Sequence, residues 1–237
     1  MTRPAGAARA PVQNVGSGYA RPAMPNILKI VQAGHPVLRQ KARRLTPEEL
    51  RTPEIARLIE DMRETMRDAP GVGLAAPQIG LPLQLVVIED KPEYSERADA
   101  EEMRARGRTP VPFQVLANPR LHIVDATPVE FFEGCLSVTD MMMVVPRVRA
   151  VRVDALDHAG RPVTLSAEGW PARILQHEID HLRGVLCIDR MRSRTFMSAR
   201  NYGHHWASLP VARVLAEVGH TDATDARLLG DDVEIPG

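Results

Sequence analysis

The stretch from Gly169 to Gly184 constrains the fold of this chain more than any other segment. Pro171 suits the first turn of a helix, where its missing N–H is not needed, and Gly184 suits the position just after the last turn. At about 100° per residue, one face of such a helix carries two imidazoles, a carboxylate and an apolar side chain: His177, His181, Glu178 and Ile174. The stretch therefore predicts a helix of about three turns with its polar groups on one stripe.

The five residues from His177 to His181 form an H-E-x-x-H pattern. Polar groups on a stripe with apolar neighbours are costly to bury unless something binds them. Histidines at i and i+4 can hold one metal ion, and the glutamate between them can move a proton. A pattern this short also occurs by chance in ordinary helices, so support must come from the rest of the chain.

Composition excludes several classes of partner. The 237 residues include 30 Lys and Arg and 30 Asp and Glu, so the formal net charge is zero and gives no signal for nucleic acid or a membrane surface. The two cysteines, Cys135 and Cys187, are too few for a disulfide framework and fit a reducing compartment. No apolar run approaches the length of a membrane span.

The chain divides into three predicted regions. Residues 1–25 contain arginines, no acids and many Ala, Gly and Pro, and we expect a disordered arm there. A transit peptide is the alternative, although the prolines would break its amphipathic helix. Residues 26–200 are expected to form the main domain, and residues 201–237 a C-terminal extension with a short helix over residues 210–218.

Short strands precede the H-E-x-x-H helix in a run. After an amphipathic helix that begins near Thr52, strands are predicted at residues 84–89, 114–116, 121–124 and 128–132. Residues 148–156 and 161–165 are predicted to form a hairpin, and residues 185–188 one more strand. Because the strands do not alternate with helices, we expect an α+β fold, with antiparallel or mixed sheets packed around a central metal-binding helix.

A catalytic site of the zinc type needs a third protein ligand and one open position. The candidates are the remaining histidines, the acids and Cys135. His204 and His205 are adjacent, so they point to different sides of a helix or strand, and we expect them at the surface. Cys135 is either a ligand or an ordinary buried cysteine, and we interpret Cys187, between two apolar residues, as the latter.

Three separated motifs resemble, in the same order, those of the peptide deformylase family. They are Gly71-Val72-Gly73-Leu74-Ala75-Ala76-Pro77-Gln78, Glu133-Gly134-Cys135-Leu136-Ser137 and Gln176-His177-Glu178-Ile179-Asp180-His181. The resemblance runs from about Ile27 to Phe196, and the segment Gly169-Trp170 is similar to the form found in eukaryotic organelles and some bacteria. Three motifs in order are far more specific than any one.

The resemblance implies a hydrolase that removes the N-formyl group from the N-terminal methionine of new proteins and releases formate. It implies that one divalent metal ion is held by Cys135, His177 and His181. Glu178 matches the general acid and base, and the Gln78 amide and the Leu136 N–H match the donors to the oxyanion. The positions implied for substrate contact are Val72, Gly73, Gly134, Trp170 and Ile174.

The family also implies Fe²⁺ as the native metal, with Zn²⁺, Ni²⁺ or Co²⁺ able to replace it. The implied partners are N-formylmethionyl nascent peptides and, as a further candidate, the ribosome near its exit tunnel. We expect a bacterial cytoplasmic protein, or an organellar one if residues 1–25 are a transit peptide. Where many bacterial members carry a basic residue, this chain has Met141-Met142-Met143, which leaves its peptide-length preference open. We also expect Glu133 and Arg147 to form an ion pair beside Cys135.

Two alternatives stay open at this point. The first is an H-E-x-x-H endopeptidase, whose third ligand usually follows the helix. The second is a catalytically silent module that binds metal and docks on ribosomes or nascent chains. Glu178 and Gln78 argue against the silent module, because it has no physical need for either side chain.

Overall fold

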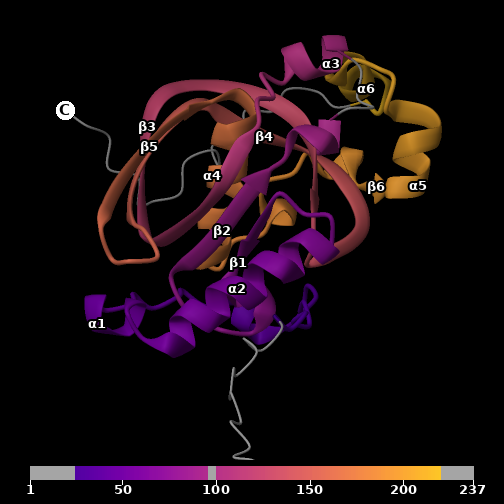
Figure 1. Cartoon of the computed structure of the whole chain (residues 1–237). Helices are drawn as coiled ribbons and strands as arrows, with labels where there is room; N and C mark the ends of the chain where they lie inside the picture. The colour runs from indigo at the N-terminus through magenta and orange to yellow at the C-terminus, as the bar shows by residue number, and fades with distance from the viewer. Residues whose placement is uncertain (1–24, 96–99, 220–237) are drawn as a thin grey trace, which may run out of the picture.

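The computed structural model describes residues 25–95 and 100–219 (Figure 1). Its strands form a sheet in the order β1-β2-β3-β4-β5, with β6 paired to β4. Every pairing between these strands is antiparallel within the described residues. The strands are β1 Gly73–Ala75, β2 Leu85–Asp90, β3 Val111–Cys135, β4 Val138–Leu156, β5 Pro162–Glu168 and β6 Met197–Ser198.

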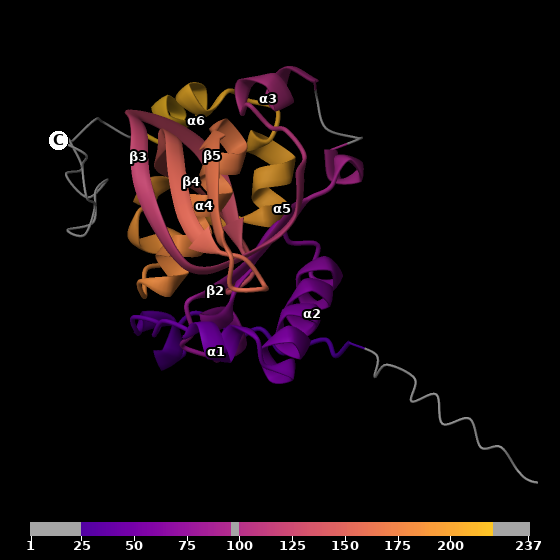
Figure 2. The ribbon, with the colours of Figure 1, turned by 60° about the vertical axis from the view of Figure 1, so that its left-hand side comes forward.

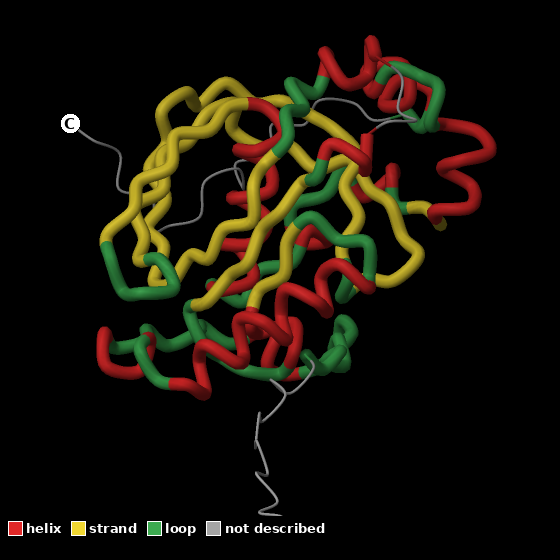
Figure 3. Tube along the Cα trace, viewed as in Figure 1, coloured by secondary structure: helices red, strands yellow, loops and turns green. Residues whose placement is uncertain are grey.

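The described residues also form α-helices and short 3₁₀ turns. The α-helices are α1 Pro47–Leu50, α2 Pro53–Asp68, α3 Ala100–Ala105, α4 Gly169–Leu182, α5 Ala199–Asn201 and α6 Val211–Glu217. The 3₁₀ turns are η1 Pro36–Arg39, η2 Ala76–Ile79, η3 Pro92–Ser95, η4 Cys187–Asp189 and η5 Ser193–Thr195, and Tyr202–Trp206 is a π-helical turn. The predicted α+β class is confirmed, and Figure 3 shows long strands together with helices that pack inside and beside them.

Strands β3 and β4 are long and bend around α4 (Figures 1 and 2). The start of β3 pairs with β2, and its register with β4 shifts repeatedly between Ala117 and Cys135. Such bulges bend a strand and increase its twist. The prediction of three short strands within residues 114–132 was therefore wrong, because bulges interrupt the alternation of side chains without ending the strand. The predicted hairpin is confirmed as β4 and β5.

Two hydrophobic clusters hold the layers together. Ile174, Leu175 and Ile179 of α4 pack against Val151 and Val153 of β4. A second cluster joins α2 to β1 and β2, and its members Met62, Met66 and Leu74 have no exposed surface. Helix α2 begins where the sequence predicts, because the Thr52 hydroxyl accepts the N–H of Ile55. Helix α4 is thus packed against β1, β4 and β5.

The segment after α4 departs from the prediction. Residues 185–188 form no strand: η4 follows a turn at Gly184, whose φ of 76° favours glycine. Beyond β6, the chain packs over Phe132 and Val144 through Tyr202, Trp206 and α6. The predicted short helix over residues 210–218 corresponds to α6, and His204 and His205 are exposed as expected.

Parts of the domain prediction stay untested. Residues 1–24 of the predicted arm and residues 220–237 of the C-terminal extension lie outside the described residues. The boundaries at residues 25 and 200 therefore stay predictions. Within the described ranges, no helix combines the length and apolar character needed to cross a membrane.

Asn118 joins the N-terminal segment to the first bulge of β3. Its φ is 53°, it is buried, and its amide both accepts the N–H and donates to the carbonyl of Leu45, each at 2.8 Å. Asn118→Asp keeps the acceptor but leaves the Leu45 carbonyl without a donor. We expect the free energy of unfolding to fall by about 1–3 kcal/mol in urea titrations. Asn201→Asp, at an exposed position, is the control, and equal effects of the two changes would contradict this account.

Candidate metal centre

Helix α4 and the end of β3 bring a thiol and two imidazoles together. The candidate ligand atoms of Cys135, His177 and His181 all lie within 4.8 Å of one another. The Nε2 atom of His181 is 3.4 Å from the Cys135 sulfur, and the two imidazole rings meet edge to face with centroids 5.0 Å apart. The residues that the sequence places 42 positions apart thus share one site.

The donor set fits a divalent transition metal. Thiolate and imidazole are the ligands that zinc and similar ions prefer, and three of them leave an open position. One further polar atom in this site, Oε2 of Glu178, is buried without a hydrogen-bond partner. Buried polar atoms of this kind normally have a partner, so the site suits an ion with its water or substrate.

Glu133 orients one of the two histidines. Its carboxylate receives Nδ1–H of His177 at 3.0 Å, which leaves Nε2 of that ring toward the cluster. Arg147 donates to both carboxylate oxygens of Glu133 at 3.0 Å, so the predicted ion pair is confirmed. Burial would raise the pKa of Glu133, yet Arg147, the bond from His177 and Arg173 hold it well below its usual value. Burial opposes the charge on His177, but Glu133 raises its pKa to about 9 in the metal-free site, so an ion that binds this ring displaces a proton.

The charge network extends through residues that the sequence did not identify. Arg173 donates to Glu133 at 2.6 Å and to the carbonyl of Val145 at 2.7 Å, and Arg147 also donates to Asp180. On a helical wheel, Arg173 and Asp180 lie opposite the histidines, on the face that a surface helix usually turns to solvent. Both are instead 3–4% exposed, because β4 covers that face of α4. The sequence held one hint of this burial: a helix expected at the centre of the fold carries charged residues on the face away from the histidines.

Gln78 and Gly73 border the cluster as the motifs suggest. Gln78 is 1% exposed, and its Oε1 accepts the N–H of Ala75 at 2.8 Å. Its amide nitrogen therefore points to the Ser137 hydroxyl, at 3.4 Å, and to the Cys135 sulfur, at 3.8 Å. A Cβ atom at Gly73 would lie 2.2 Å from Oε1 of Glu178, so this position requires glycine.

The other motif residues surround the same region. Gly134 is exposed beside Met142, and Leu136 is half-buried against Gly71. Val72, Trp170 and Ile174 belong to one hydrophobic cluster, so they can form a shared apolar wall beside the thiol and imidazole cluster.

Arg106 and Arg108 contribute to the apolar wall more than the sequence indicated. Arg106 and Arg108 place their guanidinium carbons 5.4 and 5.3 Å from the centre of the Trp170 ring. The indole N–H of Trp170 donates to Asp90 at 3.1 Å, and Asp90 also pairs with Arg108. Both guanidinium groups therefore pack on Trp170, and neither is merely solvated.

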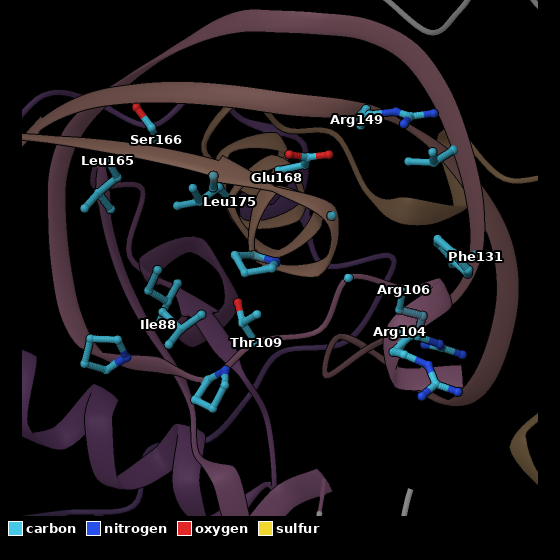
Figure 4. Close-up of a pocket in the computed structure, with 18 of the residues that line it drawn as sticks. Ile88, Arg104, Arg106, Thr109, Phe131, Arg149, Leu165, Ser166, Glu168 and Leu175 are labelled. Carbon is cyan, nitrogen blue, oxygen red and sulfur yellow. The ribbon is translucent and has the colours of Figure 1, made fainter. Parts of the chain in front are cut away.

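A separate cavity of about 740 Å³ lies at the N-terminal end of α4 (Figure 4). Arginines gather with Phe131 on one side of it, and apolar side chains such as Ile88 and Leu165 lie on the other. None of the predicted site residues lines this cavity. It is therefore distinct from the thiol and imidazole cluster.

Glu178 and His181 are perturbed mainly by burial. Burial raises the pKa of Glu178 to about 7 and lowers the pKa of His181 well below its usual value. A carboxyl group with a pKa near 7 can both take and give a proton at neutral pH, as a general acid and base must. A neutral His181 is the form that binds metal ions.

Comparison with known proteins agrees with this site. The family model described as polypeptide deformylase matches residues 27–196. Peptide deformylase 1A, chloroplastic, of Solanum lycopersicum is 44% identical over 197 residues, which cover 83% of this chain and 68% of that relative. Peptide deformylase 3 of Streptomyces avermitilis is 45% identical over 81% of this chain and 84% of its own length. The mitochondrial peptide deformylase of Homo sapiens is 41% identical over 74% of this chain and 72% of its own length.

Solved structures give the same result. A peptide deformylase from Acinetobacter baumannii, bound to Met-Ala-Ser, matches with a TM-score of 0.63 and 30% identity over 70% of this chain and 99% of that one. A peptide deformylase from Synechococcus elongatus, in complex with actinonin, matches with a TM-score of 0.59 and 34% identity over 78% of this chain and 88% of that one.

The fold, the thiol and imidazole cluster and these relatives define a metal-dependent hydrolase of protein biosynthesis. The chain belongs to the peptide deformylase family. It is an enzyme that acts on N-formyl peptides and removes the formyl group from their N-terminus. The endopeptidase and the silent module find no support in these comparisons.

The raised pKa of Glu178 predicts a pH-dependent stability. Because the folded chain binds this proton more tightly than the unfolded chain, the free energy of unfolding falls as pH rises from 4.5 to about 7. Glu178→Gln removes this dependence in metal-free protein. We expect the variant to exceed the parent by about 3 kcal/mol near pH 8, and to match it near pH 4.5, in urea unfolding with a chelator present.

Glu93→Gln is the matched control, because Glu93 is exposed. The difference in the free energy of unfolding between this control and the parent should be the same at both pH values. A constant difference between the Glu178 variant and the parent at both pH values would show that the carboxyl titrates normally.

Proposed function

We propose that Cys135, His177 and His181 hold the metal of this deformylase and that Glu178 is its general acid and base. The observation that carries the proposal is the convergence of the three ligand atoms within 4.8 Å, beside a buried carboxyl oxygen without a partner. A divalent ion held there would supply an acidic water, with a pKa of roughly 7, and would polarise the formyl carbonyl.

Glu178 handles the proton in this proposal. Its carboxylate accepts a proton from the attacking water and returns it to the leaving amine, which departs as the free N-terminus while formate is released. In the metal-free site burial raises its pKa to about 7, and the positive charge of a bound ion would favour the carboxylate that accepts the proton. The close approach of Gly73 keeps this carboxyl in place, since a side chain there would displace it.

Gln78 and Leu136 are proposed to stabilise the negative charge that builds on the formyl oxygen. The bond from Ala75 fixes the Gln78 amide so that its NH₂ group faces the cluster. The Leu136 N–H follows Cys135 directly at the end of β3. Fixed donors of this kind cost no reorganisation when the charge develops.

The apolar residues are proposed to bind the methionine side chain. Val72, Trp170 and Ile174 form its pocket, while Gly73 and Gly134 let the substrate backbone approach closely. Met142 packs with Phe132, Tyr202 and Trp206, so apolar packing takes the place of a basic contact to the peptide.

Fe²⁺ is proposed as the native metal, with Zn²⁺, Ni²⁺ or Co²⁺ as replacements, because a thiolate makes the site softer and more sensitive to oxidation. The proposed place of action is the ribosome near its exit tunnel, where formylated N-termini emerge. Relatives carry bacterial, chloroplast and mitochondrial names, which supports either the bacterial cytoplasm or an organelle as the location. Metal analysis after anaerobic purification tests the first of these proposals.

Cys135→Ser tests the ligand set. Serine offers a hard hydroxyl in place of a soft thiolate, so we expect the bound metal to fall at least about tenfold, as measured by elemental analysis after dialysis. Cys187→Ser is the matched control and should keep its metal, because Cys187 lies outside the ligand group. Unchanged metal in the Cys135 variant would instead favour a third ligand elsewhere.

Glu178→Ala and Gln78→Ala test the chemistry. Formate release from formyl-Met-Ala-Ser should fall by about 10²–10⁴-fold in the first variant and by about 10²–10³-fold in the second. Both should keep the metal. Glu168→Ala, which changes an exposed acid, should release formate at the parent rate. Turnover that survives Glu178→Ala would defeat the proposed mechanism.

A further inference from the structure

The two cysteines of this chain lie beside each other. Cys135 ends β3 and Cys187 opens η4, yet both belong to one cluster with Val138, Met143 and Val145. The Cys135 side chain packs against the cluster that contains Cys187, and each thiol shifts the pKa of the other, so the two side chains lie close together. The sequence contains no other cysteine.

Cys187 has no part in the chemistry proposed above. It is not one of the three residues whose ligand atoms converge. It is 1% exposed, whereas Cys135 is half-buried at the site. A small oxidant that enters the site therefore meets Cys135 first, with a second thiol directly behind it.

The position of Cys187 is fixed by its neighbours. Asp189 accepts the N–H of Leu186 at 2.8 Å and also pairs with Arg39 of η1, so both sides of Cys187 are tied down. Leu186 itself is fully buried. The proximity of the two thiols thus comes from the packing of η4 against the end of β3.

We propose that Cys187 is a resolving cysteine, which forms a reversible disulfide with Cys135 when the site is exposed to hydrogen peroxide. The proposal rests on the proposed metal role of Cys135 only for its consequence, since the disulfide removes one of the three ligands. Nothing in the pairing itself requires turnover.

The chemistry is balanced with peroxide as the oxidant. The Cys135 thiol gives up its proton as its sulfur attacks one peroxide oxygen, the O–O bond breaks, and Cys135 becomes a sulfenic acid while the leaving hydroxide takes up that proton as water. The Cys187 sulfur then attacks the Cys135 sulfur, the S–O bond breaks, and the oxygen leaves as water with the Cys187 proton. In sum two thiols are oxidised, peroxide is reduced to two waters, and an added dithiol reverses the change.

The consequence is protection of Cys135 from irreversible damage. A sulfenic acid without a nearby thiol proceeds to sulfinic and sulfonic acids, which ordinary thiols do not reduce. A contacting thiol captures it first. Loss of the thiolate leaves two imidazoles, so the metal is released until the disulfide is reduced.

The test treats metal-free, full-length protein with hydrogen peroxide and analyses it by mass spectrometry and thiol titration. We expect free thiols to fall from two per chain to none, with a mass loss of two hydrogen atoms, a linked pair of Cys135 and Cys187 peptides, and recovery with dithiothreitol. Cys187→Ser and Cys187→Ala should instead accumulate sulfinic or sulfonic acid at Cys135, which dithiothreitol does not restore. Circular dichroism shows whether each variant is folded.

Two outcomes would overturn the proposal. One is a parent protein whose Cys135 becomes sulfinic acid while Cys187 stays a free thiol. The other is a disulfide that links two chains, seen as a dimer on a non-reducing gel. Metal content and formate release are measured separately on reduced protein, so failure of the proposed function and failure of this inference give different results.

Discussion

One buried carboxylate, that of Glu133, holds the catalytic region together. It lies on β3, and it accepts hydrogen bonds from Arg147 of β4 and from Arg173 and His177 of α4. Burying a charge is costly unless opposite charges and hydrogen bonds satisfy it, and here donors reach both oxygens. Removing Glu133 would leave the buried Arg173 without its acidic partner. The end of β3 is therefore locked to the middle of α4.

This lock explains why a cysteine and two histidines can share a site. Cys135 is two residues beyond Glu133 on the same strand, and His177 is one turn beyond Arg173 on the same helix. Fixing the carboxylate to both elements thus fixes the sulfur relative to the imidazole. The bulges of β3 complete the arrangement, because they let one strand pair with β2 at its start and still reach α4 at its end.

The sequence predicted the elements whose signals are local. Helix α4, helix α2 and the hairpin of β4 and β5 have regular periods and clear boundaries, and the three motifs pointed to residues that the fold brings together. The continuity of β3 was missed because bulges disturb the alternation of side chains. Arg173, Asp180, Arg106 and Arg108 were missed for another reason: each is explained by a partner distant in the sequence. The neighbouring sequence does not show whether a charged side chain is exposed to solvent or is buried and paired with an opposite charge.

Two glutamates near the same histidine end in opposite states, and the difference comes from their neighbours. Glu133 and Glu178 are both about 4% exposed, so burial penalises the charge of each. Glu133 faces two guanidinium groups and an imidazole, and its pKa stays well below the usual value. Glu178 has no hydrogen-bond partner for Oε2 and lies against the backbone of Gly73, so burial dominates and its pKa rises to about 7. One carboxylate therefore serves as a permanent charge that orients His177, while the other can exchange a proton at neutral pH. The two carboxyl groups differ because Arg147 and Arg173 face Glu133 rather than Glu178. Strand β4, which covers the side of α4 away from the histidines, carries Arg147 and encloses Arg173.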